Sequence, residues 1–290
     1  MTTTLRPTGP LQQAADGTLS RSYEVCVNSR PVGAVDIGTA PGFGPAVGTV
    51  SGLRIDEADR GRGRGTVAAL AAEEVLRGWR CERIRISVPA DSSAALRLAT
   101  ALGYTERSRT LVKTLGAADA DEPPSGPPVR PMTEPEFQRW RAAAEEAYAR
   151  SWIARGTPEA AARAKSRSDH AALLPDGLAT EGARLYVVER PDGTTAGHLW
   201  TGRRSLDPRR SLDPAGDGAH AYVWDIQVDD RDRGRGYGRA LMRHAERVAR
   251  EELGTDRIGL HVFSDNTPAR RLYESLGYRP VEIHLDKHLY

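Results

Sequence analysis

Cysteine, phenylalanine and methionine are scarce in this chain of 290 residues, which has two, three and three of them. The two cysteines, Cys26 and Cys81, are too few for a disulfide framework and lack the spacing of metal ligands. No apolar run approaches the ~18 residues that cross a membrane, and residues 1–17 lack the pattern of a signal peptide. The net charge of only +2 gives no strong field for nucleic acid or an anionic membrane. We therefore expect a cytoplasmic protein without a metal, nucleic-acid or membrane partner.

An internal repeat organises the chain. Residues 60–65 and 233–238 both read Arg-Gly-Arg-Gly-X-Gly, and the two stretches lie 173 positions apart. Downstream, residues 94–104 resemble residues 268–278 at a spacing of 174 positions. Two blocks that keep their spacing to within one residue indicate duplicated domains. We predict a first domain at 1–116, a linker rich in Asp, Ala and Pro at 117–128, and a second domain at 129–290.

The second copy has the clearer secondary-structure pattern. Thr133 and Glu136 form a capping box that opens a helix to about residue 155, and Thr157 with Pro158 begins another that ends near 174. Alternation, turns and apolar periodicity predict the remaining elements. These are strands at 185–189, 195–201, 222–228, 257–263 and 281–289, helices at 236–252 and 267–276, and a polar loop at 204–218.

The first copy is shorter. No counterpart of the two opening helices is visible before Tyr23. Its predicted elements are strands at 23–27, 32–37, 47–55 and 84–88 and helices at 63–77 and 94–102.

The glycine run of the second copy follows a strand that ends at Val228 and precedes a helix. Backbone N–H groups at such a turn are unsatisfied and bind phosphate oxygens, and the helix dipole adds to the attraction. Gly236 and Gly238 would let the backbone approach a pyrophosphate, and neighbouring arginines supply countercharge. A dinucleotide-binding fingerprint would need an acidic residue about 20 positions on, at the end of the next strand, where this chain has a helix end. An arginine-rich surface turn is the other alternative.

Two longer stretches make the pattern more specific. Residues 226–241 resemble motif A of the GNAT superfamily of N-acetyltransferases, and residues 260–278 resemble its motif B, in the right order and spacing. The resemblance implies an α+β fold with a mixed sheet, present as two tandem GNAT-like domains. Each sheet would be splayed and flanked by helices. Acetyl-CoA would lie in the splay between the strands that end at Val228 and Phe263.

The resemblance also assigns roles to residues. Ile226, Gln227 and Val228 would pair through their backbone with the pantetheine arm and polarise the thioester carbonyl. Asn266 would contact the pantetheine region, and Tyr273 would protonate the departing thiolate, since a phenol suits that proton transfer. The pyrophosphate maps to Arg233, Gly234, Arg235, Gly236, Tyr237, Gly238 and Arg239.

The sequence leaves several candidates for the general base. One family position for it carries Tyr222, which is a poor base at neutral pH. The other lies on the motif B strand and carries His261, a plausible base. A water relay, His220 or Asp225 are alternatives. Alternation puts Asp225 on the face opposite His220, unless a bulge redirects it.

The first copy departs from the family pattern. It keeps Gly61, Gly63 and Gly65, but Ala99 stands at the tyrosine position, Ser92 at the Asn266 position and Ser87 at the His261 position. We interpret it as a degenerate copy that either retains CoA binding or braces the other domain.

The predicted function is transfer of an acetyl group from acetyl-CoA to a primary amine by direct attack in a ternary complex. Catalysis would take place in the C-terminal domain, and the acceptor would be a small-molecule amine or a peptide N-terminus. The chain would be a monomer or homodimer. Alternatives are a catalytically silent acetyl-CoA sensor and an enzyme similar to mycothiol synthase, which is itself a tandem GNAT enzyme.

Overall fold

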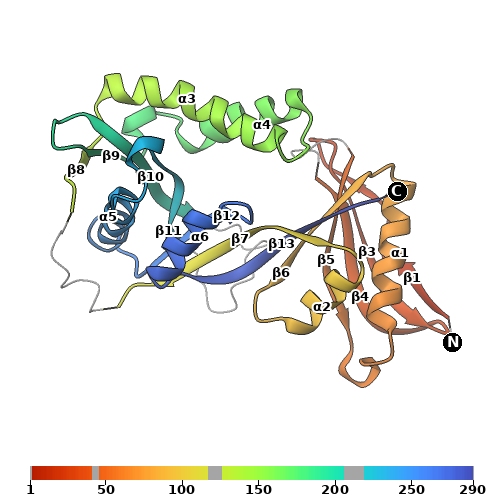
Figure 1. Cartoon of the computed structure of the whole chain (residues 1–290). Helices are drawn as coiled ribbons and strands as arrows, with labels where there is room; N and C mark the ends of the chain where they lie inside the picture. Colours follow the sequence, from red (N-terminus) through yellow and green to blue (C-terminus); the bar gives the residue numbers. More distant parts are fainter. Residues whose placement is uncertain (1, 41–45, 117–125, 206–218, 290) are drawn as a thin grey trace. The chain divides into compact units, whose positions relative to one another are not determined.

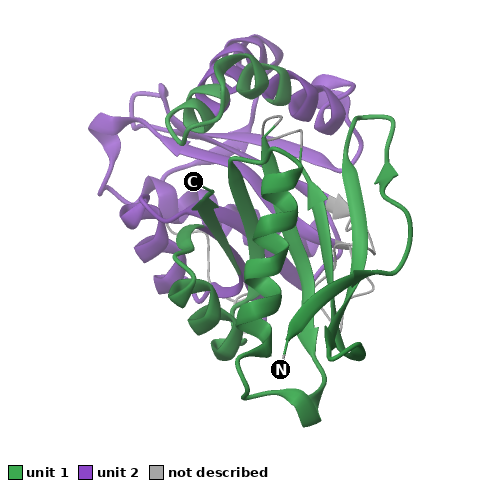
Figure 2. Cartoon of the chain, turned by 90° about the vertical axis from the view of Figure 1, so that its right-hand side faces the viewer, with its two compact units in different colours: residues 1–107, 149–165, 283–290 green, residues 108–148, 166–282 purple. Residues whose placement is uncertain are grey.

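The chain folds into two compact units, seen in a computed structural model that describes residues 2–40, 46–116, 126–205 and 219–289 (Figures 1 and 2). Unit 1 comprises residues 1–107, 149–165 and 283–290, and unit 2 comprises 108–148 and 166–282. The linker predicted at 117–128 and the polar loop predicted at 204–218 lie mostly outside the described residues.

Unit 1 is built on a mixed sheet. Its strands follow the order β1, β3, β4, β5, β6, β13, and the short β2 pairs with β3. The bounds of its elements are β1 (Thr3–Pro7), β2 (Gln12–Gln13), β3 (Leu19–Val27), β4 (Arg30–Thr39), β5 (Val47–Ile55), η2 (Glu57–Asp59), α1 (Arg64–Gly78), β6 (Arg83–Pro89) and α2 (Ser93–Ala101). Neighbours are antiparallel from β1 to β5, and β6 is parallel to β5 because helix α1 connects them.

Unit 2 repeats this plan in the order β7, β12, β11, β10, β9, β8. Its sheet is mixed as well, with one parallel pair, β11 and β12, joined by helix α5. The bounds are β8 (Val129–Pro131), η4 (Gly177–Ala179), β9 (Ala183–Glu189), β10 (Thr195–Ser205), β11 (Ala219–Val228), η5 (Asp230–Asp232), α5 (Tyr237–Glu251), β12 (Arg257–Phe263) and α6 (Thr267–Ser275). The predicted α+β class and the tandem arrangement are confirmed.

Four elements contribute residues to both units. They are β7 (Thr105–Thr114), α3 (Glu134–Ile153), α4 (Glu159–Leu173) and β13 (Arg279–His288). Residues 149–165, which by sequence belong to the opening helices of the second copy, pack in unit 1. The predicted absence of opening helices before Tyr23 is confirmed, since β1 and β2 occupy that stretch.

The last strand of each copy completes the other copy's unit. In unit 2, β7 pairs antiparallel with β12 from Arg257↔Thr114 to Phe263↔Ser108. In unit 1, β13 lies next to β6, and the Leu289 N–H donates to the Glu82 carbonyl over 2.8 Å. The predicted ranges 1–116 and 129–290 therefore describe sequence copies, whereas the compact units exchange a strand.

An ion pair with a buried carboxylate accompanies each exchanged strand. Lys113 of β7 lies 3.0 Å from Glu246 of α5 in unit 2. Lys287 of β13 lies 2.7 Å from Glu73 of α1 in unit 1. Lys287 is 174 positions after Lys113, and Glu246 is 173 positions after Glu73, so the two pairs obey the repeat. Both units therefore have the same exchanged strand and the same ion pair.

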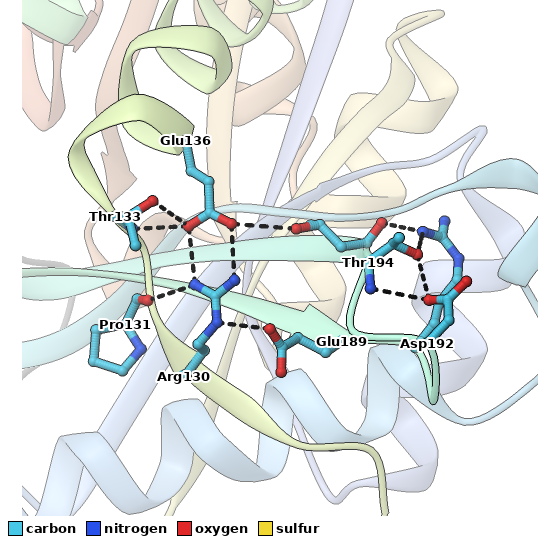
Figure 3. A network of polar contacts seen from close by, with 9 residues as sticks. Arg130, Pro131, Thr133, Glu136, Glu189, Asp192 and Thr194 are labelled. Atoms are coloured by element: carbon cyan, nitrogen blue, oxygen red, sulfur yellow. Dashed lines mark hydrogen bonds and ion pairs between the residues drawn. The ribbon is translucent and has the colours of Figure 1, made fainter.

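A polar network fixes the start of α3 (Figure 3). The Thr133 N–H and hydroxyl both donate to the Glu136 carboxylate, at 2.8 and 2.7 Å, which is the predicted capping box. Arg130 of β8 donates to both oxygens of Glu136 and to Glu189 at the end of β9. This hydrogen bonding from Arg130 lowers the pKa of Glu136 to about 2, although burial opposes the shift. The helix is therefore anchored to the sheet edge by charge-assisted bonds.

Each unit has its own apolar core, and unit 2 has a second one below α3 that contains Phe137, Trp140 and Trp200. Cys26 and Cys81 are buried free thiols of unit 1. Among the helices in the described ranges, none is long and apolar enough to cross a membrane.

Candidate active site

The sheet of unit 2 opens between β11 and β12. Their parallel pairing runs from Ala221↔Ile258 to Val223↔Leu260 and goes no further in the described residues. Beyond this point β11 still pairs with β10, up to Gly197↔Val228. The backbone of Ile226, Gln227 and Val228 therefore has one edge that β12 does not use, and an extended ligand arm can hydrogen-bond there.

The glycine loop leaves β11 through η5 and enters α5. Gly234 has φ +77° and Gly236 has φ +89°, a left-handed conformation that favours glycine. Gly236 is the N-cap of α5 and makes no side-chain cap bond, so the first N–H groups of the helix point outward. A Cβ at Gly238 would lie 3.2 Å from Leu272, so this glycine also allows α5 and α6 to pack closely. The loop has the geometry of an anion-binding turn.

The buried carboxylate of Asp232 holds the start of this loop in place. Asp232 accepts two bonds from Arg190, at 2.6 and 3.0 Å, and these lower its pKa. Arg190 also reaches Asp229 over 2.5 Å. The exposed Arg233 pairs with Asp230 and the exposed Arg235 approaches Asp232. The loop is therefore positively charged at its surface and fixed at its base.

Three further predicted residues lie on α5 and α6. The Tyr237 side chain is buried in the core, so only its backbone faces the loop. Arg239 donates to the Ser275 hydroxyl over 2.8 Å, which ties α5 to α6. Asn266 is the N-cap of α6, and its Oδ1 accepts from the Ala269 N–H over 3.2 Å.

Tyr273 lies on α6 with 6% of its surface exposed. Burial and, next, the negative charge of Asp225 raise the pKa of its hydroxyl well above the ordinary value. The phenol is therefore protonated at neutral pH.

A β-bulge redirects Asp225. The register of β10 and β11 shifts from Trp200↔Asp225 to Thr201↔Val223, so Trp224 is one residue extra. Asp225 consequently shares its face with Tyr222, and the Trp224 ring lies 4.6 Å from the Tyr222 ring. The sequence predicts Asp225 on the face opposite His220 unless a bulge redirects it. The structure contains such a bulge.

His220 and His261 lie on this same face. A Cβ on Gly259 would come within 3.2 Å of the His220 ring, and His261 is two residues further along β12. The His261 ring packs edge-on against Phe263 at 5.2 Å. All three side chains considered as a base thus occur on one face of the sheet.

Sequence reasoning missed His198 and Trp140. His198 Nε2 lies 2.8 Å from Asp225 Oδ2, and the Trp140 indole N–H donates to the same oxygen over 3.3 Å. Burial raises the pKa of Asp225, but the bond from His198 and its charge lower it more, so the net shift is downward. His198 could be found only from strand register, which places it opposite Gln227.

Unit 1 has the same loop. Asp59 is buried and held by Arg30 and Arg64, and Gly61 and Gly63 have φ +73° and +72°. The parallel pairing of β5 with β6 likewise ends after three residue pairs, at Thr49↔Arg85.

The chemistry of the two sites differs, however. At a spacing of 173 or 174 positions, Gly52, Ala99 and Ser87 stand where unit 2 has Asp225, Tyr273 and His261. The β4–β5 register gives Ala34 at the place of His198, since it lies opposite Arg54. Unit 1 therefore has the loop and the splay without the acid, the carboxylate or the histidines.

A mixed sheet that opens beside a glycine loop with the geometry of an anion-binding turn, present twice in one chain, is the arrangement expected of a tandem acyl-CoA-dependent transferase. A model of the acetyltransferase (GNAT) family matches residues 5–104 and again residues 141–278. The chain belongs to this family. It is an acetyltransferase, and the family's donor is acetyl-CoA.

Curated relatives match one or both copies. A mycothiol acetyltransferase of Beutenbergia cavernae is 30% identical over 261 residues, which cover 85% of this chain and 79% of the relative. An uncharacterised N-acetyltransferase of Bacillus subtilis, YdgE, is 28% identical over 159 residues, covering 54% of this chain and 95% of the relative.

Solved structures support the fold. A GCN5-related N-acetyltransferase from Sphaerobacter thermophilus has a TM-score of 0.57 at 20% identity, and covers 92% of this chain and 80% of its own. A tandem GNAT protein from the clavulanic acid pathway has a TM-score of 0.53 at 18% identity, covering 95% and 85%. Among the described residues, no group of three or more His, Cys, Asp or Glu side chains could hold a metal ion.

Proposed function

We propose that unit 2 transfers the acetyl group of acetyl-CoA directly to a primary amine in a ternary complex. The observation that carries the proposal is the sheet that opens between β11 and β12 beside the glycine loop, with the buried Tyr273 phenol on α6. The cofactor would lie along the free edge of β11 with its pyrophosphate on the amides of the loop from Gly234 to Arg239. Unit 1 has no equivalent acid, which supports catalysis in unit 2 alone.

The reaction needs three proton transfers: two from the acceptor nitrogen and one to the departing thiolate. The acceptor ammonium first loses a proton, for which His261 is the proposed base, directly or through a water molecule. The amine nitrogen then attacks the thioester carbon while a backbone N–H of residues 226–228 stabilises the developing oxyanion. The C–S bond breaks and the thiolate takes the proton of Tyr273, while the nitrogen of the tetrahedral intermediate gives its extra proton to the Tyr273 phenolate, directly or through water, to leave the amide. His220 is the alternative base on the same face.

The test is release of free thiol from acetyl-CoA with a panel of amines. The panel comprises an L-amino acid, glucosamine, a peptide with a free N-terminus and mycothiol in its unacetylated form. We expect at least one amine to stimulate thiol release well above the rate of hydrolysis. Binding of acetyl-CoA without stimulation by any amine would instead favour the silent sensor.

A mycothiol acetyltransferase is the second candidate function. It is supported by relatives of that name that align with both copies at 30% identity, over 85% and 80% of this chain. Unacetylated mycothiol would then be the preferred member of the amine panel. A specificity constant for it no higher than that for the amino acid would remove this candidate.

A further inference from the structure

The Asp225 carboxylate is held on one side and open on the other. Among the described residues, its hydrogen bonds all end on Oδ2, which receives both His198 and Trp140. Its side chain is 35% exposed, so the carboxylate is not sealed in the core. Oδ1 is therefore available to a ligand.

Three elements produce this arrangement. The bulge at Trp224 turns Asp225 toward the face covered by α3, the register of β10 brings His198 beside it, and the second turn of α3 supplies Trp140. Two side chains fixing one oxygen leave the carboxylate little rotational freedom. A ligand that binds Oδ1 does not have to order the group first.

The charge around Asp225 selects for a cation. The groups that act on it are His198 from β10, Trp140 from α3 and His170 from α4, and its own charge acts on Tyr273 of α6. Within the described part of the chain, its one ion-pair partner is His198, and neither Arg nor Lys neutralises it. An ionised, partly exposed carboxylate that no Arg or Lys of the described residues neutralises matches an alkylammonium group.

We propose that Asp225 binds the ammonium group of the acceptor through Oδ1, and that His198 and Trp140 are positioning residues that hold it. The inference rests on the proposed function and deepens it, because it makes the acceptor a cationic primary amine. Held there, the nitrogen loses its proton to His261 or water before attack. Unit 1 has Gly52 and Ala34 at these two positions and offers no such anchor.

The first test compares Asp225→Asn with wild type on the best amine of the panel. We expect KM for the amine to rise at least tenfold, with KM for acetyl-CoA unchanged within twofold. Glu145→Gln is the control, since Glu145 is a carboxylate of α3 that pairs with Arg141. A fall in kcat at unchanged amine KM would overturn the anchor role and make Asp225 the base.

The second test separates positioning from bulk structure. His198→Leu removes the bond to Oδ2, and we expect it to raise the amine KM as Asp225→Asn does. His198→Gln can still donate a hydrogen bond, and we expect it to restore most of the affinity. Equal defects in the two variants, with unchanged circular dichroism and acetyl-CoA affinity, would contradict the positioning role.

A third measurement does not depend on turnover. A carboxyl ¹³C NMR titration, assigned through Asp225→Asn, reports the charge of Asp225 directly. We expect an ionised carboxylate at pH 7, and a neutral one would overturn the proposal even if every amine is acetylated. If the carboxylate is ionised but no amine of the panel stimulates thiol release, the proposed function is refuted instead. The two failures are therefore distinguishable.

Discussion

Two tyrosines in the core of unit 2 meet different surroundings. The rings of Tyr273 and Tyr278 lie 6.0 Å apart, and both are buried. Burial raises the pKa of both hydroxyls, but the next contribution comes from Asp225 for Tyr273 and from Glu246 for Tyr278. Glu246 belongs to the ion pair of the exchanged strand, whereas Asp225 borders the splay. Position relative to the splay therefore separates a candidate acid from a core residue of the same type.

We predict that Tyr273→Phe lowers kcat at least tenfold with little change in the affinity for acetyl-CoA, because acid assistance is lost while packing is kept. Steady-state kinetics and calorimetry measure the two effects. Tyr278→Phe is the matched control and should retain kcat within about twofold. Wild-type turnover of Tyr273→Phe would remove this residue from the mechanism.

The paired glycines allow a second test. Gly236→Ala forces a Cβ into a left-handed backbone at the N-cap of α5, which costs on the order of 1 kcal/mol or distorts the loop. We expect KM for acetyl-CoA to rise at least about fivefold, because a loss of ~1.4 kcal/mol corresponds to a tenfold change. Gly63→Ala imposes the same strain at the N-cap of α1 in unit 1. It should lower stability similarly and leave the kinetics unchanged.

Among the elements, α3 depends most on charge at its first turn. Arg130, Thr133 and Glu136 connect β8 to the helix, and Thr195 Oγ1 lies 3.5 Å from Glu136 at the start of β10 (Figure 3). Trp140, which contacts Asp225, follows one turn later. The capping network thus orients the helix that holds the proposed anchor.

We predict that Glu136→Gln destabilises unit 2 at neutral pH by on the order of 2 kcal/mol, and less at low pH. Arg130 is 36% exposed, which screens part of the interaction. The folded-state pKa of Glu136 is about 2, below its ordinary 4.5. Its contribution is therefore complete above pH 4.5 and disappears as the pH falls through about 2. Urea unfolding at pH 7 and pH 2.5 measures the difference.

Glu134→Gln serves as the control for that experiment. Glu134 is exposed on the same first turn and accepts a bond from Gln138 within the helix. Its substitution should change the unfolding free energy by less than about 0.5 kcal/mol at either pH. An equal effect of both substitutions would contradict a specific role of the Arg130–Glu136 pair.

Local chemistry made most elements predictable. The strand at 47–55 and the helices of both motifs occur within two residues of their predicted bounds, because apolar periodicity and caps are read from neighbours in sequence. Strand β7 was missed, although Leu111 and Lys113 recur as Leu285 and Lys287. Its partner, β12, lies more than 140 residues away, and no local pattern identifies such a partner.

The same limit applies to the site. The loop and the phenol follow from the glycines and the motif position of Tyr273. The anchor around Asp225 depends on a bulge and on the register of β10. Both determine the face of the sheet on which a side chain lies. Tertiary pairing alone determines both, so His198 could not be recognised beforehand.

At the scale of the molecule, the exchanged strands tie each unit to the other copy's sequence. We predict that Lys113→Met in the full chain destabilises unit 2, the proposed catalytic unit, by about 3–5 kcal/mol, since it leaves Glu246 buried without this partner. Thermal unfolding and loss of activity on heating measure it. Lys113→Met combined with Glu246→Met should recover most of the loss, because two apolar side chains replace the pair.

Lys287→Met is the reciprocal variant. It affects Glu73 in unit 1, so unit 1 should lose stability while acetyl transfer in unit 2 persists at moderate temperature. Equal loss of activity in the Lys113 and Lys287 variants would contradict this assignment.

The strand exchange also bears on how such a chain is inherited. After a gene duplication, a copy that lacks the acid and the carboxylate is ordinarily free to decay and be deleted. Here the first copy contributes β7 to the sheet beside His261, through Thr110 opposite that histidine. A deletion of the first copy would remove the strand that pairs with β12 in the proposed catalytic unit. If the second copy catalyses acetyl transfer as proposed, selection for that activity also preserves this strand of the first copy.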